Sequence, residues 1–373
     1  MRRSSFEALR PACPACRSRE RVNSSLSIAT AETGTDEYID CGILQCSRCS
    51  GEFPVIDGMA ILVPDVRRFV EDNLFYLMAR TDLPPAVESL LGDAAGASSG
   101  LQSIRQHTSS YVWDHWGDHD PAERGEAAGG ARPGSVARAL ERGLAMLSDK
   151  LPDGPILDLG CGPGRVAAEL AERTGRLVVA ADLSIALARV ARRVVADGVV
   201  EYPRRRVGLV YDRRRFSVAA PGSDSVEVWI CDALNLPFGD GSFALATAMN
   251  LIDCVTEPRS VLTELGRVIR PGGEALIALP FDWTDRVTAM EHWLGGHSQR
   301  GWHQGRAEDV LDLLLSDGEM AAGPLRRTGE AVEIPWHVRL HDRSCMHYNC
   351  RMVSARRDSA SDATASERSA DQG

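Results

Sequence analysis

The feature that most constrains this chain is a glycine-rich turn between an apolar run and a helix-forming stretch. The apolar run ends around Asp158, and the turn contains Gly160, Gly162 and Gly164. Glycine is needed in such a turn because the backbone bends sharply and a ligand approaches where a Cβ would collide. The turn opens a helix, whose free N–H groups face the ligand. By itself, the turn is typical of dinucleotide-binding proteins and also of unrelated loops.

Two further apolar runs end in an acidic residue. Residues 177–181 lead to Asp182, and residues 229–231 lead to Asp232. An acidic residue at the tip of the second strand is placed to accept hydrogen bonds from both hydroxyls of a ribose. The later pieces are a hydrophobic strand over 243–251, a Pro-Gly-Gly turn at 271–273 and a strand over 274–279.

In this order the motifs resemble those of the class I S-adenosylmethionine-dependent methyltransferases, over about residues 151–355. The resemblance implies an α/β fold, in which a Rossmann-like seven-stranded sheet carries helices on both faces. It also implies S-adenosyl-L-methionine as the methyl donor. Nicotinamide-dependent dehydrogenases are the main competitor, but their turn usually reads G-x-G-x-x-G, whereas this one reads G-x-G-x-G.

The resemblance implies a role for each motif residue. Asp158 would reach the ammonium of the methionine portion, Asp182 would hold the ribose hydroxyls, and Asp232 would accept from the adenine amino group. The other implied contacts are Gly160, Cys161, Gly162 and Gly164 beside the methionine portion, Leu183 and Ala233 on the adenine faces, and Asn250 near the methyl group. Acidic residues at strand ends also cap the following helix, which is the alternative for Asp182 and Asp232.

The implied reaction is in-line displacement of a sulfonium methyl group by a nucleophile. Because the donor is already activated, the protein mainly supplies proximity and alignment, which are worth about 7–11 kcal/mol. A general base is needed only if the acceptor must lose a proton. An imidazole or amine nitrogen attacks as a neutral lone pair, whereas a hydroxyl usually needs help.

The acceptor side is expected after the fourth and fifth strands. Residues 281–297, with Asn250 and the region of Trp336, resemble the methyltransferase domain of ovothiol-biosynthesis enzymes, which acts on a ring nitrogen of a mercaptohistidine. This chain has a cysteine-rich segment in place of the iron-dependent, sulfur-inserting domains of those enzymes, so the ovothiol substrate is not carried over. The candidates for catalysis or acceptor contact are Asn250, Asp282, His292 and His297, with a surface or packing role as the alternative for the histidines.

Four of the ten cysteines form two close pairs, Cys13 with Cys16 and Cys46 with Cys49, and 29 residues lie between the pairs. Each pair can sit on a tight knuckle whose thiolates point at one ion, and two knuckles complete a tetrahedral Zn2+ site. A redox dithiol would need only one pair beside a βαβ unit, and four unrelated buried cysteines are the remaining alternative. Cys41 is surplus and is expected to be a packed thiol.

The segment after the second pair, residues 51–65, alternates apolar residues around an Asp-Gly turn and predicts a β-hairpin. Together with the cysteine pairs, it resembles the zinc ribbons that include the small activator subunit of eukaryotic and archaeal methyltransferases. Similar ribbons are fused to bacterial methyltransferases, including a guanine-modifying enzyme of ribosomal RNA. A metal would contribute roughly 10–16 kcal/mol of apparent binding energy to the folding of so small a unit.

Four segments are predicted along the chain. They are a zinc ribbon over 1–66, a helical linker and cofactor lid over 67–150, the methyltransferase domain over 151–355 and a disordered tail over 356–373. Residues 92–100 and 125–134 are small and polar and predict loops. Between them, the aromatic segment 111–118 resembles the N-terminal lid of ribbon-fused methyltransferases, and an anchor between the ribbon and the main domain is the alternative.

Two further clusters have both a functional and a structural interpretation. The arginine runs 204–206 and 213–215 could grip phosphate or RNA, but a solvated hairpin is favoured because arginine is the prevailing basic residue and lysine occurs only at Lys150. The histidines and cysteines of 337–350 could bind a second metal, but their spacing matches a terminal antiparallel hairpin better.

Charge limits the partners of the chain. It has 373 residues and a net charge of −10, which argues against broad electrostatic binding to nucleic acid or to anionic membranes. Residues 1–70 contain nine arginines and nine acidic residues, so the ribbon has no basic excess to follow phosphates. No run approaches about 18 apolar residues and the N-terminus lacks an apolar signal segment, so we expect a cytoplasmic protein with reduced thiols.

The favoured function is therefore methyl transfer to a small-molecule acceptor, at nitrogen or oxygen. An RNA-base methyltransferase that uses the zinc ribbon to dock its substrate is the first alternative. A non-catalytic module in which the ribbon docks a protein partner is the second, and it predicts that S-adenosylmethionine does not bind.

Overall fold

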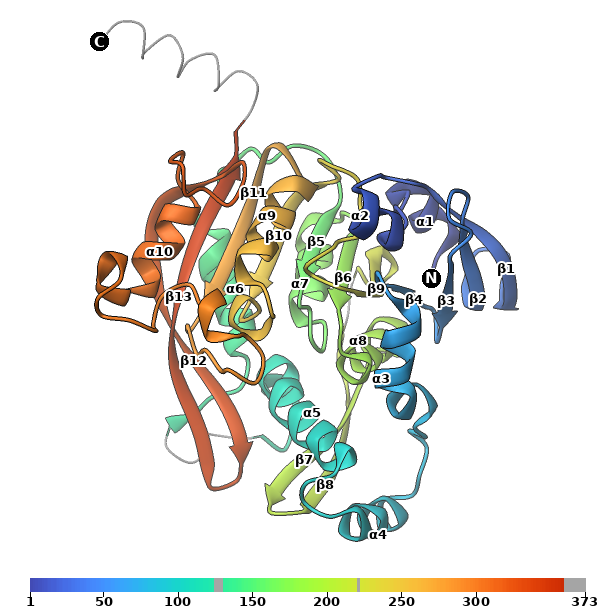
Figure 1. Ribbon diagram of the computed structural model, residues 1–373. Helices are drawn as coiled ribbons and strands as arrows, with labels where there is room; N and C mark the ends of the chain where they lie inside the picture. Colours follow the sequence, from blue (N-terminus) through green and yellow to red (C-terminus); the bar gives the residue numbers. More distant parts are fainter. Residues whose placement is uncertain (124–129, 220–221, 359–373) are drawn as a thin grey trace, which may run out of the picture.

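One mixed β-sheet runs through the computed structural model, which describes residues 1–123, 130–219 and 222–358 (Figure 1). Within these residues the sheet has eleven strands, and β7 and β8 form a separate two-stranded sheet. The strands β1 to β4 form one edge of the large sheet, and β12 and β13 form the other (Figure 1). No helix in the described ranges is both long and apolar enough to cross a membrane.

Strands and helices alternate through most of the chain. The strands are β1 (Leu26–Gly34), β2 (Ile39–Cys46), β3 (Glu52–Ile56), β4 (Met59–Leu62), β5 (Ile156–Leu159), β6 (Val178–Asp182), β7 (Val199–Val207), β8 (Val210–Ser217), β9 (Val226–Cys231), β10 (Phe243–Met249), β11 (Ile269–Leu279), β12 (Leu325–His341) and β13 (Ser344–Arg357). The α-helices are α1 (Arg3–Leu9), α2 (Pro14–Glu20), α3 (Val66–Met78), α4 (Pro85–Ala95), α5 (Gly100–Trp116), α6 (Ser135–Leu144), α7 (Arg165–Thr174), α8 (Ile185–Asp197), α9 (Pro258–Val268) and α10 (Ala307–Leu314). The 3₁₀ segments are η1 (Gly117–His119), η3 (Ser223–Ser225), η4 (Ile252–Cys254), η5 (Met290–His292) and η6 (Trp302–Gly305).

The middle of the large sheet has the strand order and directions of a doubly wound fold. The order is β9-β6-β5-β10-β11, and each neighbouring pair is parallel. β13 then runs antiparallel to β11, and β12 runs antiparallel to β13. These seven strands form the Rossmann-like sheet that the motifs predict, so the predicted fold class is confirmed.

Alternate residues of the central strands point to opposite faces, and each face has its own layer of helices. On β5, Leu157 joins a core that includes Leu262 of α9, whereas Ile156 joins a second core that includes Val166 of α7. The first core also holds residues of α1 and α10, and the second holds residues of α3, α6 and α8. Burial on both faces explains why these strands read as continuous apolar runs.

The cysteine-rich segment continues the main sheet. The hairpin predicted over 51–65 is formed by β3 and β4, with Val55 opposite Ala60. β4 then pairs in parallel with β9, through Ile61 opposite Ile230. The strands β1 to β4 therefore extend the sheet beyond β9. The boundaries between the predicted domains stay a prediction.

Two local predictions need correction. β11 already begins at Ile269, where the sequence placed a turn at 271–273, and the Pro-Gly-Gly segment makes a register shift inside the strand. Part of the loop predicted over 92–100 is helical, because α4 runs to Ala95. A Cβ at Gly92 would lie 2.3 Å from a guanidinium nitrogen of Arg105, so glycine is used there for a close approach between α4 and α5.

Two other predictions lie partly outside the described residues. β13 continues to Arg357, two residues into the predicted tail, because Arg356 pairs with Glu274 of β11 and Arg357 pairs with Leu325 of β12. The rest of that tail, residues 359–373, and residues 124–129 of the second predicted loop are outside the described residues.

Helix α5 and the β7–β8 hairpin pack together beside the large sheet. Trp113 and Trp116 of α5 are buried in one core with Val200 and Tyr202 of β7. The aromatic segment of 111–118 thus supplies the core of this interface.

The arginine runs of the hairpin are paired with acidic residues of this chain. The ion pairs join Arg204 to Glu123 and Asp342, Arg213 to Glu88 and Glu201, Arg214 to Asp120, and Arg215 to Glu201. Several of these acids come from α4, from the segment after η1 and from the turn between β12 and β13. The hairpin therefore ties distant segments together, and most of its arginines are paired with acidic residues of this chain, which weighs against a cationic surface for RNA.

The predicted terminal hairpin is present as β12 and β13. His337 lies opposite His347, and its Nδ1 accepts a hydrogen bond from the backbone N–H of Arg132 at 3.0 Å. In the part of the chain that the structure describes, the histidines and cysteines of this hairpin do not form a metal-binding group.

We expect Asp120→Ala to lower the free energy of unfolding by about 1.5–3 kcal/mol, the scale of hydrogen bonds to a charged group. Asp120 is 5% exposed and accepts hydrogen bonds from two guanidinium nitrogens of Arg214, at 2.9 and 2.5 Å. Arg215→Ala is the matched control, since the Arg215 side chain is 64% exposed and its loss should cost at most about 1 kcal/mol. Urea denaturation measures both, and equal losses would contradict the role given to Asp120.

Candidate functional site

The glycine-rich turn has the backbone conformation that its sequence predicts. Gly160, Gly162 and Gly164 have φ values of 69°, 51° and 84°. A Cβ would lie 2.9 Å from Leu251 at Gly160 and 2.8 Å from the Cβ of Ala191 at Gly164. Other residues would therefore meet both backbone strain and a steric clash at these positions.

The end of α5 is packed on this turn. Trp116 Nε1 donates to the carbonyl of Pro163 at 2.9 Å, and the N–H of Arg165 donates to His115 Nδ1 at 3.4 Å. Burial, and then the charge of Arg165, lower the pKa of His115 to about 3, so its ring stays neutral near pH 7. Arg165 also pairs with Asp118 at 3.0 Å. The contacts fix α5 against the turn, whereas its role as a cofactor lid stays a prediction.

Asp158 has one carboxylate oxygen without a partner. Its Oδ1 accepts a hydrogen bond from Thr247 Oγ1 at 2.7 Å, while the buried Oδ2 has no hydrogen bond among the described residues. Asp158 is 2% exposed, and burial raises its pKa to about 7. An unpaired buried carboxylate oxygen is costly, so a ligand ammonium at this position would satisfy it.

Asp182 serves the turn and the next helix at the same time. Its Oδ2 accepts from the N–H of Gly162 at 2.7 Å, and its Oδ1 accepts from the N–H of Ser184, the N-cap residue of α8, at 2.7 Å. The hydroxyl of Ser184 caps α8 itself, and Asp182 holds that N-cap residue in place, so the role of Asp182 stays a prediction. A carboxylate has about four acceptor positions, so two remain for ribose hydroxyls. Burial raises the pKa of Asp182, and the neighbouring side chain of Leu183 is 47% exposed.

Asp232 lies at the tip of β9, one strand beyond Asp182. Its Oδ1 accepts from the N–H of Leu234 at 2.9 Å, and burial raises its pKa. Ala233 beside it is buried, and so is Cys161 of the glycine-rich turn. Asp158, Asp182 and Asp232 therefore lie at the carboxyl ends of three neighbouring parallel strands, in the order the sequence predicts.

Asn250 and Asp282 follow the next two strands, β10 and β11. Asn250 adopts a φ of 53°, and its Oδ1 accepts from the thiol of Cys350 at 3.4 Å. The N–H of Asp282 donates to Asp253 Oδ2 at 2.9 Å, and the hydroxyl of Tyr348 donates to Asp282 Oδ2 at 2.7 Å. The catalytic roles predicted for Asn250 and Asp282 stay predictions.

Several polar residues of this region were not singled out from the sequence. Burial and then the carboxylates of Asp253 and Asp282 raise the pKa of Cys254 to about 12. Desolvation, with smaller effects from Cys254, Asp182 and Asp253, also raises the pKa of Tyr111, which belongs to the aromatic segment 111–118. The sequence could have indicated Asp253, which lies in the loop after the fourth strand. Tyr348 gave no such signal, because the terminal hairpin brings it from far along the chain.

The two candidate histidines lie elsewhere. His292 Nδ1 is 2.7 Å from Glu257 Oε1, and it lies 3.3 Å from the carbonyl of Thr256. His297 is exposed. Among the described residues neither histidine has a hydrogen bond or an ion pair with Asn250 or Asp282. Their catalytic role stays a prediction.

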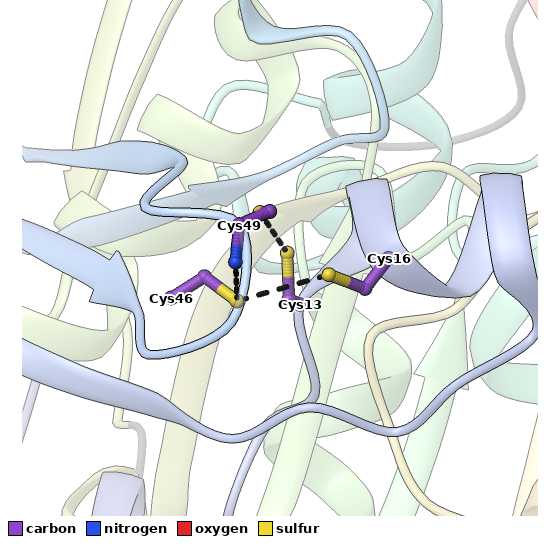
Figure 2. Close-up of side chains that lie close together, drawn as sticks. All are labelled: Cys13, Cys16, Cys46 and Cys49. Carbon is purple, nitrogen blue, oxygen red and sulfur yellow. Dashed lines mark hydrogen bonds between the residues drawn. The ribbon is translucent and has the colours of Figure 1, made fainter.

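The four paired cysteines come together at one point (Figure 2). Their sulfur atoms all lie within 4.8 Å of one another, with Cys13 to Cys49 at 3.7 Å and Cys16 to Cys46 at 3.8 Å. Zn–S bonds of about 2.3 Å in a tetrahedron put neighbouring sulfurs about 3.8 Å apart. The donor set and its spacing therefore fit a zinc ion. Cys41 is not part of this group.

The local backbone supports a thiolate at Cys46, whereas burial raises the pKa of Cys13 and of Cys16. The N–H of Cys49 donates to Cys46 Sγ at 3.5 Å, and Ser24 Oγ lies 3.3 Å from the same sulfur. Burial by itself raises the pKa of a thiol, but at Cys46 these donors outweigh it and lower the pKa to about 6. The N–H of Gly51 donates to Cys49 Sγ at 3.4 Å in the same way. Thiolates are the form that binds a metal.

Comparisons with known proteins bear on the glycine-rich turn and the parallel strands around it. The family described as "Methyltransferase domain" matches residues 157–277. A demethylmenaquinone methyltransferase of Clavibacter sepedonicus is 38% identical over 122 residues, which are 33% of this chain and 39% of that protein. A phosphatidylethanolamine N-methyltransferase of Cereibacter sphaeroides is 33% identical over 160 residues, which are 40% of this chain and 76% of that protein. A solved S-adenosylmethionine-dependent methyltransferase of Methanosarcina mazei is 19% identical, with coverage of 58% of this chain and 96% of that one and a TM-score of 0.38.

The family match covers the glycine-rich turn and the parallel strands that carry Asp158, Asp182 and Asp232. The chain spans less than half the length of several curated relatives, including 45% of the methyltransferase GfsG of Streptomyces halstedii, to which it is 32% identical over 38% of its own length. It spans about three quarters of the Cereibacter sphaeroides protein. This chain belongs to the class I S-adenosylmethionine-dependent methyltransferases.

Proposed function

We propose that this chain transfers a methyl group from S-adenosyl-L-methionine to a small-molecule acceptor, at nitrogen or oxygen. The observation that carries the proposal is the unpartnered, buried Oδ2 of Asp158 beside a turn of three positive-φ glycines. A carboxylate in that position suits an ammonium group, and the bare backbone of the turn suits a close-lying ligand.

The remaining contacts of the donor follow the edge of the sheet. We assign the ribose hydroxyls to Asp182 and the adenine amino group to Asp232. Leu183 and Ala233 would cover the adenine faces, and Asn250 would lie near the methyl group. The turn residues Gly160, Cys161, Gly162 and Gly164 would pass beside the methionine portion.

The donor supplies an activated methyl group, so this chain has mainly to orient the acceptor and to move a proton where one is lost. Asp282 is the candidate base, and its contacts with this chain orient it: its Oδ2 accepts a hydrogen bond from Tyr348, and its N–H donates to Asp253. Burial raises the pKa of Asp253, so this neighbouring carboxyl is a second group that could take up a proton. A neutral amine or imidazole acceptor would need no such base.

The four cysteines Cys13, Cys16, Cys46 and Cys49 are proposed to hold a structural Zn2+. The site has four thiol ligands and no open position for a substrate, as structural zinc sites have. The ion would bind at the end of β2 and the start of α2, where it joins α2 to the sheet. Docking of a protein partner through this segment stays a prediction.

A small-molecule acceptor is favoured over RNA on two grounds. The arginines of the β7–β8 hairpin are used in ion pairs within the chain, and the net charge is −10. Relatives of the matched domain include enzymes named for demethylmenaquinone and for phosphatidylethanolamine, neither of which is a nucleic acid. The ovothiol-like acceptor segment stays a prediction.

Incubation with methyl-labelled S-adenosylmethionine and fractionated cell extract tests the proposal directly. Label in a small-molecule fraction is expected, and mass spectrometry of that fraction gives the acceptor and the atom methylated. Label in RNA or in protein would overturn the proposed acceptor class. Absence of both labelling and donor binding would favour the non-catalytic alternative.

Asp182→Ala should weaken binding of S-adenosylhomocysteine by about 1.5–3 kcal/mol, the scale of hydrogen bonds to a charged group. Isothermal titration calorimetry measures the dissociation constant. Asp240→Ala is the control, because the side chain of Asp240 is 63% exposed and pairs with Arg267. An unchanged dissociation constant in a folded Asp182→Ala protein would mean that this carboxylate only caps the turn and α8.

Binding of S-adenosylhomocysteine should strengthen as the pH rises from about 5.5 to 8. The pKa of Asp158 is about 7 in the free protein, so this carboxyl is protonated at low pH and cannot pair with an ammonium. Its folded pKa exceeds the unfolded value, so ionisation of Asp158 costs folding stability as the pH rises through 7, and the ligand ammonium offsets that cost.

Calorimetry at several pH values measures the effect, with a slope of up to roughly tenfold per pH unit below 7. Burial raises the pKa of Asp182 as well, so Asp158→Asn is the control that isolates Asp158. The variant should bind more weakly and with a flatter pH profile. Wild-type affinity that does not change over this range would contradict the assigned ammonium contact.

A further inference from the structure

The loop that follows β9 is attached to the cysteine cluster. Asn235 Nδ2 donates to the carbonyl of Pro14 at 2.8 Å, and the N–H of Ala12 donates to the carbonyl of Pro237 at 2.9 Å. Pro14 lies directly after Cys13, so both contacts reach the knuckle that carries two of the four thiols. This loop begins at Asp232, the acidic tip assigned above to adenine.

The same loop is held from a second side. The N–H of Leu236 donates to Glu264 Oε2 at 2.8 Å, and Arg17 Nη2 lies 3.5 Å from Glu264 Oε1. Glu264 is 9% exposed, so its carboxylate is almost removed from water. Arg17 follows Cys16 on α2. Helix α2 therefore reaches the loop both directly, through Pro14, and through the carboxylate of Glu264.

The sheet supplies a third connection. β4 pairs in parallel with β9 up to Leu62 opposite Cys231, the residue before Asp232. The cysteine pair of 46–49 is joined to β4 through β3. The first cysteine pair is thus connected to the loop that begins at Asp232, and the second pair is connected to the strand that precedes it.

We infer that Asn235 is a positioning residue, which ties the loop that begins at Asp232 to the turn that carries Cys13 and Cys16. As a result, a metal bound at the four cysteines and the donor bound at the carboxyl ends of the strands would favour each other's binding. The inference rests on the proposed donor site and adds to it that the cysteine cluster takes part in donor affinity. Asn235 is not among the residues assigned to either ligand, and it would act through the position of the loop.

The physical reason is the position of one carbonyl group. A metal that holds both Cys13 and Cys16 fixes the first turn of α2, and with it the carbonyl of Pro14. Without the metal, that turn is free to move, and the loop must be ordered when the donor binds. Thermodynamic linkage then requires the reverse effect, in which bound donor strengthens the hold on the metal.

Calorimetry on the zinc-loaded full chain tests the first half. Asn235→Ala should weaken S-adenosylhomocysteine binding by about 3- to 10-fold, the effect of one neutral hydrogen bond. The variant should keep one zinc ion per chain by elemental analysis and an unchanged melting temperature. Arg19→Ala is the matched control on the same helix, since the side chain of Arg19 is exposed near the end of α2.

A base analogue gives a readout that a general loss of stability would not change. S-inosylhomocysteine carries an oxygen in place of the adenine amino group, so wild-type protein should bind it more weakly than S-adenosylhomocysteine. In Asn235→Ala the ratio of the two affinities should be smaller, because Asp232 is less well placed. An equal ratio in wild type and variant would contradict the positioning role.

Zinc transfer to a coloured chelator tests the reverse effect. S-adenosylhomocysteine should slow the release of zinc from the wild-type chain several-fold, and it should slow it less in Asn235→Ala. If wild type binds S-adenosylhomocysteine, while the variant binds it equally well and zinc release does not respond to it, the inference is wrong and the proposed function stands. If wild type does not bind S-adenosylhomocysteine at all, both are wrong.

Discussion

Parallel pairing of β5 with β6 and β10 is the constraint on which the candidate site depends. It sets Asp158 opposite Ala180 on one side and Thr247 on the other. The carboxyl ends of the three strands therefore lie side by side at the same end of the sheet. The turn after β5 is held to this end by the N–H of Gly160, which donates to the carbonyl of Ala181 at 2.8 Å. A register shift of one residue would move Asp158 to the other face of the sheet and remove it from the site.

The distribution of charge follows from the same arrangement. Among the described residues Asp158, Asp182 and Asp253 have hydrogen bonds to N–H, hydroxyl or thiol groups and no ion pair. The arginines of the β7–β8 hairpin form their ion pairs away from these three carboxylates. They join the hairpin to α4, to the segment after η1 and to the terminal hairpin. Burial without a cation is what raises the pKa of these carboxyl groups.

The sequence predicted the parts of the fold and site that local patterns encode. Apolar runs with acidic tips identified β5, β6 and β9, and the spacing of the cysteines identified the cluster that the structure brings together. Contacts between distant segments could not be predicted in this way. No local pattern in Tyr348 indicates that it reaches Asp282, or in Asn235 that it reaches Pro14, because each pairing is made by the tertiary fold. The hairpin that carries the arginine runs was predicted, but the acidic partners of these arginines were not, since several of them lie far along the chain.

The parallel pairing of β4 with β9 bears on the solubility of the methyltransferase sheet. An uncovered β9 would offer a row of unpaired N–H and C=O groups next to the buried side chains of Trp229 and Ile230, and such an edge is a template for aggregation. The cysteine-rich segment covers that edge, and its own outer strand, β1, is largely exposed and polar towards its end. The segment therefore shields the edge of β9 from other chains. A shortened chain that begins after this segment would expose β9, which could then pair with a strand of another molecule.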